Sequence, residues 1–278
     1  MSERFTSEDG IQLAFDVAGS GPPLLCLAGL SRNMADFEPV VAQVEHRATV
    51  IRLDSRGRGA SDFADPSTYT IGQEGRDVIA LLDHLQIERS AILGTSRGGL
   101  IAMALAPTHA HRFSGVLFND IGPDLAAQGL SPIMDTLGRP PAYRSFEDAA
   151  DRLPVALGAA FAHVSREEWR TYAKRLWREG ERRLELRYDP RLRDAILAHG
   201  ITDAFDDFWP LYDALAGIPL ALLRGENSTL LTRETVAEMA RRQPDLIHAE
   251  VPDRGHVPFL DEPVSQRTLT QFLDQIYP

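Results

Sequence analysis

The sequence contains one cysteine and one lysine, and it has no long apolar run. A chain whose only cysteine is Cys26 cannot form an internal disulfide, and it cannot build a Cys-rich zinc or iron–sulfur site. No apolar run approaches the roughly 18 residues that a membrane-spanning helix needs. The N-terminal residues lack the basic region and apolar stretch of a signal peptide. We therefore expect a cytoplasmic protein with no membrane partner.

Basic residues are fewer than acidic ones. The 278 residues include 29 Lys and Arg against 40 Asp and Glu, which gives a net charge of −11. Binding to nucleic-acid phosphates or to anionic lipid requires a basic surface, so the composition argues against both kinds of partner. Hydrophobic residues make up 44% of the chain, and a chain of this length buries a core without a disulfide or metal. The composition therefore favours a globular protein that acts on a small molecule.

Short apolar runs alternate with segments of helical periodicity in the first half of the chain. The expected strands are residues 11–17, 23–28, 49–53, 90–93, 115–118, 218–223 and 247–251. The expected helices of the same layer are residues 77–85, 99–105, 232–242 and 263–276. Continuous apolar strands that alternate with helices predict a parallel sheet with helices on both faces.

The strand pattern almost disappears between Asp124 and Ala216. The clearest helix of this segment is residues 166–187, whose apolar stripe consists of Trp169, Tyr172, Ala173, Leu176 and Trp177. The sequence therefore predicts an α/β core made of residues 1–123 and 217–278, interrupted by a helical cap of residues 124–216.

The segment Gly94-Thr95-Ser96-Arg97-Gly98 lies between a predicted strand and a predicted helix. A serine at so sharp a turn must adopt a strained backbone conformation. The residues two before it and two after it then crowd each other, so both must be small, as Gly94 and Gly98 are. The turn raises the Ser96 hydroxyl above the edge of the sheet, which makes Ser96 the candidate nucleophile.

Together with this motif, three further segments make the sequence resemble the α/β-hydrolase superfamily. Leu27-Ala28-Gly29-Leu30 resembles the oxyanion-hole turn, with Ala28 where the family often has histidine. Asp54-Ser55-Arg56-Gly57-Arg58-Gly59-Ala60-Ser61 is similar to the family's Asp-x-Arg-Gly-x-Gly-x-Ser loop. Gly255-His256, followed by Glu262-Pro263, resembles the catalytic-histidine loop. The resemblance covers the predicted core. It implies the α/β-hydrolase fold, with a mostly parallel eight-stranded sheet flanked by helices and a helical cap after the sixth strand.

A serine nucleophile needs a base and an acid that orients the base. His256 follows the last predicted strand, where it can reach over the sheet edge, and we expect it to be the base. The position where the superfamily usually carries the acid is occupied by Thr229, which cannot hold a negative charge. Asp120, at the end of strand 115–118, is the favoured acid, and Glu226 is the second candidate. The third possibility is that the chain has no true acid.

The expected chemistry is acyl transfer from a carboxylic ester or lactone, with no cofactor and no metal. The backbone N–H groups of Leu30 and Arg97 are expected to form the oxyanion hole. A serine at this turn argues against the dehalogenase and epoxide-hydrolase branches, which use a carboxylate. The resemblance is to bacterial esterases and enol-lactonases.

Three alternatives remain open at this stage. The same triad could hydrolyse a C–C bond of a β-diketone or ring-cleavage product. Cofactor-free perhydrolysis or lysis is a second alternative. The third is a ligand-binding homologue that lost its acid at Thr229 and has no catalytic activity.

Two features of the predicted cap bear on the substrate. Its aromatic residues suggest an apolar acyl or ring pocket, although most are expected in the cap's own core: Phe146, Phe161, Trp169, Trp177, Phe205, Phe208, Trp209 and Tyr212. Residues 166–193 carry ten basic and six acidic residues, with a basic stripe at i,i+4 spacing: Arg166, Arg170, Lys174, Arg178 and Arg182. One hypothesis is that Arg166 or Arg170 draws a carboxylated substrate under the cap; the other is a solvated helix face.

Overall fold

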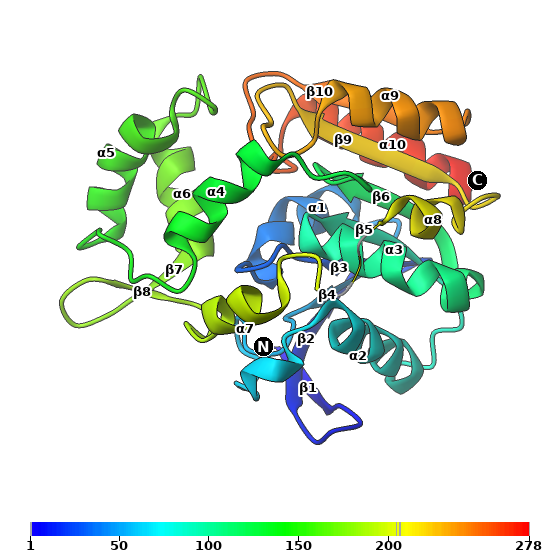
Figure 1. Ribbon diagram of the computed structural model, residues 1–278, viewed down its shortest axis with the longest axis horizontal. Coiled ribbons are helices and arrows are strands. Elements are labelled where there is room, and N and C mark those ends of the chain that lie inside the picture. The colour runs from blue at the N-terminus through cyan, green and yellow to red at the C-terminus, as the bar shows by residue number, and fades with distance from the viewer. Residues whose placement is uncertain (1, 204, 206, 278) are drawn as a thin grey trace.

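The computed structural model describes residues 2–203, 205 and 207–277, and it contains one large central sheet (Figure 1). The strands are β1 (Glu3–Thr6), β2 (Gln12–Ala18), β3 (Pro23–Leu27), β4 (Thr49–Leu53), β5 (Ser90–Thr95), β6 (Phe113–Asn119), β9 (Leu220–Gly225) and β10 (Ile247–Val251). Their order is β1-β2-β4-β3-β5-β6-β9-β10, eight strands in all. Only β1–β2 and β2–β4 pair antiparallel within this sheet. The predicted α/β fold with a mostly parallel eight-stranded sheet is confirmed.

The central strands are buried on both faces, which explains their continuous apolar sequences. Every residue of β5 and β9 is buried, as expected for parallel strands covered by helices on both sides. The edge strand β1 is different, because only Phe5 of its four residues is buried. A four-residue strand with one buried side chain shows no periodicity, so the sequence pattern did not reveal it.

Helices cover both faces of the sheet (Figure 1). They are α1 (Glu38–Val44), α2 (Ile71–His84), α3 (Arg97–His109), α8 (Trp209–Asp213), α9 (Arg233–Arg242) and α10 (Pro263–Ile276), with short 3-10 turns η1 (Met34–Phe37), η2 (Pro66–Thr68) and η3 (Ala110–Arg112). The side chains of α1 and α10 pack on one face, and those of α2, α3 and α8 pack on the other. Thr232 is the N-cap of α9, because its side chain accepts a hydrogen bond from Thr235 N at 3.0 Å.

Alternate residues of β3 face opposite sides of the sheet. Leu25 and Leu27 belong to the cluster packed against α2 and α3, whereas Leu24 and Cys26 belong to the cluster packed against α1 and α10. Burial raises the pKa of the Cys26 thiol. Cys26 is fully buried in this cluster.

The segment between β6 and β9 begins with four helices and a small hairpin: α4 (Ala127–Thr136), α5 (Phe146–Leu157), α6 (Arg166–Leu176), β7 (Trp177–Glu179), β8 (Leu184–Leu186) and α7 (Leu192–His199). The predicted helix over 166–187 is wrong beyond Leu176. Trp177 adopts an extended conformation and packs on Tyr143, with ring centroids 5.0 Å apart. Arg178 then pairs across the hairpin with Glu185 at 3.2 Å. The basic stripe therefore ends at Lys174, because Arg178 and Arg182 lie outside the helix.

Helix α8 lies beside α3, apart from α4 to α7 (Figure 1). Phe208, Tyr212 and Leu215 belong to the core cluster, and the Tyr212 ring lies 6.3 Å from that of Phe118 between centroids. The cap of residues 124–216 remains a prediction as a separate unit. Because α8 packs within the core, we propose that the cap ends before Phe208.

Candidate active site

Ser96 lies at the turn between β5 and α3, at the carboxyl edge of the sheet. Its backbone has φ 49° and ψ −117°, an unusual conformation for a residue with a side chain. A Cβ on Gly94 would lie 2.6 Å from Gly99 N, and one on Gly98 would lie 2.2 Å from Leu27 O. Both positions therefore require glycine. The predicted crowding within the turn explains Gly94, whereas Gly98 is crowded by Leu27 of β3.

The structure brings Ser96, His256 and Asp120 together from three separate segments. His256 Nε2 lies 2.9 Å from Ser96 Oγ, and His256 Nδ1 lies 2.8 Å from Asp120 Oδ2. Asp120 directly follows β6 and has φ 54°, and His256 lies in the loop after β10. The three side chains form one continuous hydrogen-bonded chain at the sheet edge.

The Asp120 carboxylate is fully buried and accepts three hydrogen bonds. Gly225 N donates to Oδ1 at 2.8 Å, and Ser228 Oγ donates to Oδ2 at 2.6 Å, where His256 also bonds. An ionised carboxylate can only accept, so His256 Nδ1 must carry the proton. His256 Nε2 is then the acceptor for the Ser96 hydroxyl, which is the arrangement that a general base requires.

The second candidate acid, Glu226, is not part of this arrangement. Its side chain is exposed and accepts a hydrogen bond from Asp253 N at 3.0 Å. Thr229 is also exposed. The loop that usually supplies the acid instead supplies two donors to Asp120, through Gly225 N and the Ser228 hydroxyl. Our sequence reasoning missed Ser228; its only signal was a small hydroxyl residue on that loop.

The two predicted oxyanion-hole donors lie beside Ser96. Arg97 is the first residue of α3, so its N–H has no partner within the helix. Leu30 N donates to no acceptor in the part of the chain that the structure describes. A Cβ on the preceding residue, Gly29, would lie 3.6 Å from Ser96 Cβ, so this turn passes next to the serine.

A buried carboxylate connects the two donors. Arg97 Nε donates to Glu74 Oε2 at 2.7 Å, and Arg58 Nη2 forms an ion pair with Glu74 Oε1 at 2.9 Å. Arg58 Nε also donates to the carbonyl of Leu30 at 2.9 Å. Glu74 on α2 is therefore linked to Arg97 directly and to Leu30 through Arg58. We call Arg58, Glu74 and Arg97 the arginine clamp.

The clamp is almost completely removed from solvent, with Arg58 at 1%, Glu74 at 2% and Arg97 at 3% exposure. Burial opposes ionisation of Glu74 most strongly, but the positive charges of Arg58 and Arg97 outweigh it and keep the pKa of Glu74 below its ordinary value. The carboxylate is therefore charged and paired on both oxygens.

The loop that follows β4 contains a second buried carboxylate. Asp54 accepts hydrogen bonds from Met34 N at 2.7 Å and from Ala60 N at 2.8 Å. Burial raises the pKa of Asp54 to about 6, and these two N–H groups offset the effect only in part. Gly59 is required nearby, because a Cβ there would lie 1.9 Å from Asp54 Oδ2. Asp54 thus fixes the loop that carries Arg58.

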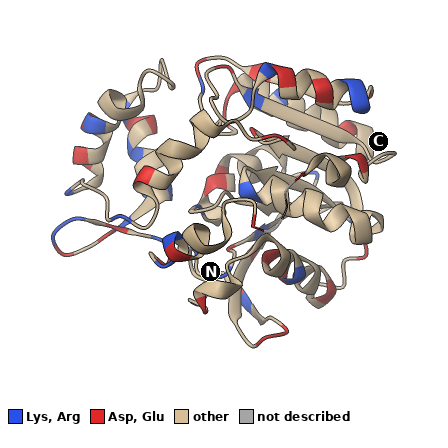
Figure 2. Ribbon diagram, in the orientation of Figure 1, with Lys and Arg blue, Asp and Glu red and all other residues tan. Residues whose placement is uncertain are grey.

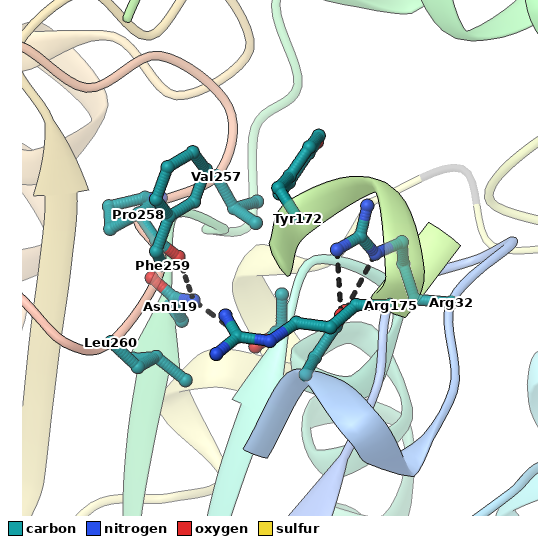
Figure 3. Close-up of a pocket in the computed structure, with 10 residues that line it drawn as sticks. Arg32, Asn119, Tyr172, Arg175, Val257, Pro258, Phe259 and Leu260 are labelled. Carbon is teal, nitrogen blue, oxygen red and sulfur yellow. Dashed lines mark hydrogen bonds and ion pairs between the residues drawn. The ribbon is translucent and has the colours of Figure 1, made fainter. Parts of the chain in front are cut away.

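A narrow cavity lies next to the triad, between α6, η1 and the loop after His256 (Figure 3). Its volume is about 10 Å³, which is the space of one water molecule. Three of its residues, Thr95, Asn119 and Val257, directly adjoin Ser96, Asp120 and His256 in the chain. The other lining residues are Arg32, Asp36, Tyr172, Arg175, Pro258, Phe259 and Leu260.

None of the eight predicted cap aromatics lines this cavity. Phe161 and Trp169 pack with Phe259 in a cluster of the cap and the histidine loop, and the rings of Phe161 and Phe259 stack at 5.3 Å. Phe208 and Tyr212 belong to the main core. The cavity is lined by both polar and apolar side chains, and the aromatic residue that α6 contributes to it is Tyr172.

The basic residues of the first turns of α6 face acidic partners at the surface. Arg166 pairs with Asp151 at 2.6 Å, and Arg170 pairs with Glu147 at 2.8 Å. Basic and acidic residues alternate over α5 and α6 (Figure 2). Neither arginine lines the cavity, so the hypothesis that they attract a substrate has no support in their positions.

Within the described residues, no cluster of three or more His, Cys, Asp or Glu side chains could hold a metal ion. In the same part of the chain, no helix combines the length and the apolar character that crossing a membrane requires.

The sheet topology, the strained serine turn and the Ser–His–Asp arrangement define the class of α/β-hydrolase proteins. The chain belongs to the alpha/beta hydrolase family, whose model matches residues 24–266. It is 34% identical to the 3-hydroxybutyrate-oligomer hydrolase of Cupriavidus necator over 257 residues, 90% of this chain and 87% of that protein.

Two further relatives extend the comparison. The chain is 25% identical to the 2-(acetamidomethylene)succinate hydrolase of Mesorhizobium japonicum over 257 residues, 92% of this chain and 89% of that protein. The crystal structure of an alpha/beta hydrolase from Novosphingobium aromaticivorans superposes with a TM-score of 0.93 at 37% identity, covering 99% of this chain and 98% of that one. The match therefore includes the segment between β6 and β9 as well as the sheet.

Proposed function

We propose that this protein is a serine hydrolase that cleaves a carboxylic ester or lactone through an acyl-enzyme. The observation that carries the proposal is the continuous chain from Ser96 to His256 to Asp120, with links of 2.9 and 2.8 Å. The distance from Ser96 Oγ to His256 Nε2 is within the range that proton transfer from serine to histidine requires.

The proposed reaction follows from the proton positions in this chain. His256 Nε2 removes the proton of Ser96 Oγ as the oxygen attacks the acyl carbon, and Asp120 stabilises the imidazolium. His256 then protonates the leaving alcohol, which departs as the acyl-enzyme forms. In the second half, His256 deprotonates a water that attacks the acyl-enzyme, and the proton returns to Ser96. The products are a carboxylic acid and an alcohol.

The arginine clamp positions the oxyanion hole in this proposal. Backbone donors stabilise an oxyanion only when they are fixed before the reaction. Glu74 holds the residue that carries one donor, Arg97, and through Arg58 it holds the carbonyl of the residue that carries the other, Leu30. Its role is therefore that of a positioning residue.

The relative with the higher identity supports ester chemistry. The relative with 34% identity acts on 3-hydroxybutyrate oligomers, whose units are hydroxy acids joined as esters. The relative with 25% identity acts on a derivative of succinate. The interpretation as a ligand-binding homologue depended on a missing acid, and the hydrogen bond between His256 and the buried Asp120 argues against it. Hydrolysis of a C–C bond on the same residues remains the second candidate.

Turnover of p-nitrophenyl esters tests the proposal. Wild-type protein should release p-nitrophenol, and Ser96→Ala should lower kcat by at least about 10⁴-fold, because the base then has no nucleophile to activate. Ser67→Ala, at an exposed position of η2, is the matched control and should behave as wild type. A vinylogous β-diketone tested in parallel distinguishes C–C cleavage. Ester turnover that survives Ser96→Ala would contradict the proposal.

A further inference from the structure

Arg175 is a buried charge that has only a long ion pair, to Glu38, and no hydrogen bond from its guanidinium to a residue that the structure describes. It lies in the last turn of α6, 9% exposed, and its carbonyl accepts a hydrogen bond from Asn33 Nδ2 at 2.8 Å. This bond fixes the end of α6 to the turn that follows β3, the same turn that carries Leu30. The Arg175 side chain extends from there into the cavity beside the triad, toward Asn119 and Leu260 (Figure 3).

The guanidinium of Arg175 makes no hydrogen bond to any residue that the structure describes, and its Nε is buried without a partner. The nearest carboxylate oxygen in an ion pair is Glu38 Oε2, 3.8 Å from Nε, on a side chain that is 59% exposed. Arg32 in the same cavity is paired, because its Nε and Nη2 each donate to Asp36 at 2.6 Å. The cavity therefore contains one guanidinium in a close ion pair, Arg32, and one with only a distant partner on an exposed side chain, Arg175.

A buried cation without a close partner is unfavourable by several kcal/mol. A bound anionic ligand would supply the missing partner. The position of Arg175 fits this role, because the cavity is lined by the residues that adjoin all three members of the triad. An anion bound there would lie next to the reacting ester.

We propose that Arg175 binds a carboxylate of the substrate, so that the protein acts on esters that carry a free carboxylic acid. The inference rests on the proposed function, since it names the substrate class of the same site. A planar guanidinium matches a carboxylate with two parallel hydrogen bonds.

The cavity is too small for a substrate while its side chains remain as they are. A volume of about 10 Å³ holds one water molecule, so the substrate must displace Tyr172 or the residues after His256. A water between Arg175 and Asn119 Oδ1, which also has no hydrogen-bond partner in the described residues, is the competing occupant. A pair of esters with and without a carboxylate distinguishes a bound carboxylate from a bound water.

The test compares two p-nitrophenyl esters of similar shape, the hydrogen succinate and the pentanoate. The first carries a carboxylate where the second carries the end of an alkyl chain. In Arg175→Met, the ratio of kcat/KM for the hydrogen succinate to that for the pentanoate should fall about 10- to 100-fold, because a charge-assisted hydrogen bond is lost. Arg175→Lys should restore part of the ratio, since it keeps the charge and loses the planar pairing.

Lys174→Gln is the matched control, because it removes a neighbouring positive charge at an exposed position of the same helix. It should leave the ratio unchanged. Inhibition of pentanoate-ester turnover by free succinate provides a second measurement, and the inhibition should weaken by a similar factor in Arg175→Met. Free succinate contains no ester bond. Its inhibition therefore also detects a site that binds a carboxylate on the alcohol part of the substrate.

An unchanged ratio together with unchanged succinate inhibition in Arg175→Met would overturn the inference and assign Arg175 to a bound water. A lower melting temperature of Arg175→Met without a change in the ratio would lead to the same conclusion. Failure of the proposed function is distinguishable, because then neither ester is turned over in a manner that depends on Ser96.

Discussion

Buried charges in two regions of the molecule differ in how closely they are paired. Beneath Ser96, the arginine clamp pairs both oxygens of Glu74 with guanidinium groups. In the cavity under α6, the Arg175 guanidinium makes no hydrogen bond within the described residues. A closely paired buried charge such as Glu74 holds protein groups in place, whereas Arg175, with only a distant partner at the cavity, points to a ligand.

Asp54 is a third buried charge, and its pairing is intermediate between that of Glu74 and that of Arg175. Asp54 is bound by backbone N–H groups and has no directly bonded cation. Burial raises its pKa to about 6, whereas the pKa of Glu74 in the clamp is below its ordinary value. Two N–H donors therefore offset burial less than two guanidinium groups do.

The largest effect is expected at the triad, where every oxygen of the acid is satisfied. Asp120→Asn should lower kcat by about 10³–10⁴-fold, because an amide cannot hold His256 in the required tautomer. Steady-state turnover of a p-nitrophenyl ester measures this change. Glu226→Gln, on the neighbouring loop, is the control and should retain wild-type turnover. The reverse pattern would assign the acid to Glu226.

The clamp should show a loss of both stability and catalysis. Glu74→Gln leaves two buried guanidinium groups with a neutral partner and should lower the free energy of unfolding by about 3–5 kcal/mol. Where the variant is folded, kcat should fall about 10- to 100-fold, because the oxyanion donors are less well fixed. Urea unfolding and ester turnover measure the two effects.

Glu238→Gln is the control for the clamp. Glu238 pairs with Arg241 and Arg242 on the exposed surface of α9, and surface pairs contribute little. Its loss should leave both measurements close to wild type. A Glu74→Gln variant with full ester turnover would show that the clamp does not position the oxyanion hole.

A smaller effect is expected in the pH dependence of stability. Because the pKa of Asp54 is about 6 in the folded state against an ordinary value of 3.8, the folded state binds the proton more tightly than the unfolded state. Stability from this group is therefore present below the unfolded pKa and is lost as the pH rises through about 6.

Asp54→Asn removes this titration. The free energy of unfolding of wild type relative to Asp54→Asn should fall by roughly 2–3 kcal/mol between about pH 4 and pH 7. Urea unfolding at several pH values measures the difference. Parallel curves for the two proteins would show that burial of Asp54 does not control its titration.

Much of the site was predictable from sequence because its parts are local. The turn at Ser96 is defined by five consecutive residues, and the strand end before Asp120 is an apolar run followed by a polar residue. Both features follow from steric crowding and from the direction of parallel strands. The choice of Asp120 over Glu226 depended only on which strand end the side chain follows.

The contacts that the sequence did not reveal join distant segments. Ser228 reaches Asp120 across 108 positions of the chain, and Asn33 reaches Arg175 across 142. No local pattern encodes such pairs. The helix predicted over 166–187 failed for a related reason, because Trp177 leaves the helical stripe to pack on Tyr143, and that packing outweighs helical periodicity.

The most direct test of the account is covalent labelling by a fluorophosphonate probe, followed by intact mass and peptide mapping. The account predicts one phosphonyl group per chain, on Ser96, with labelling that is much slower in His256→Ala. Absence of labelling, or labelling at another residue, would contradict the assignment of Ser96 as the nucleophile.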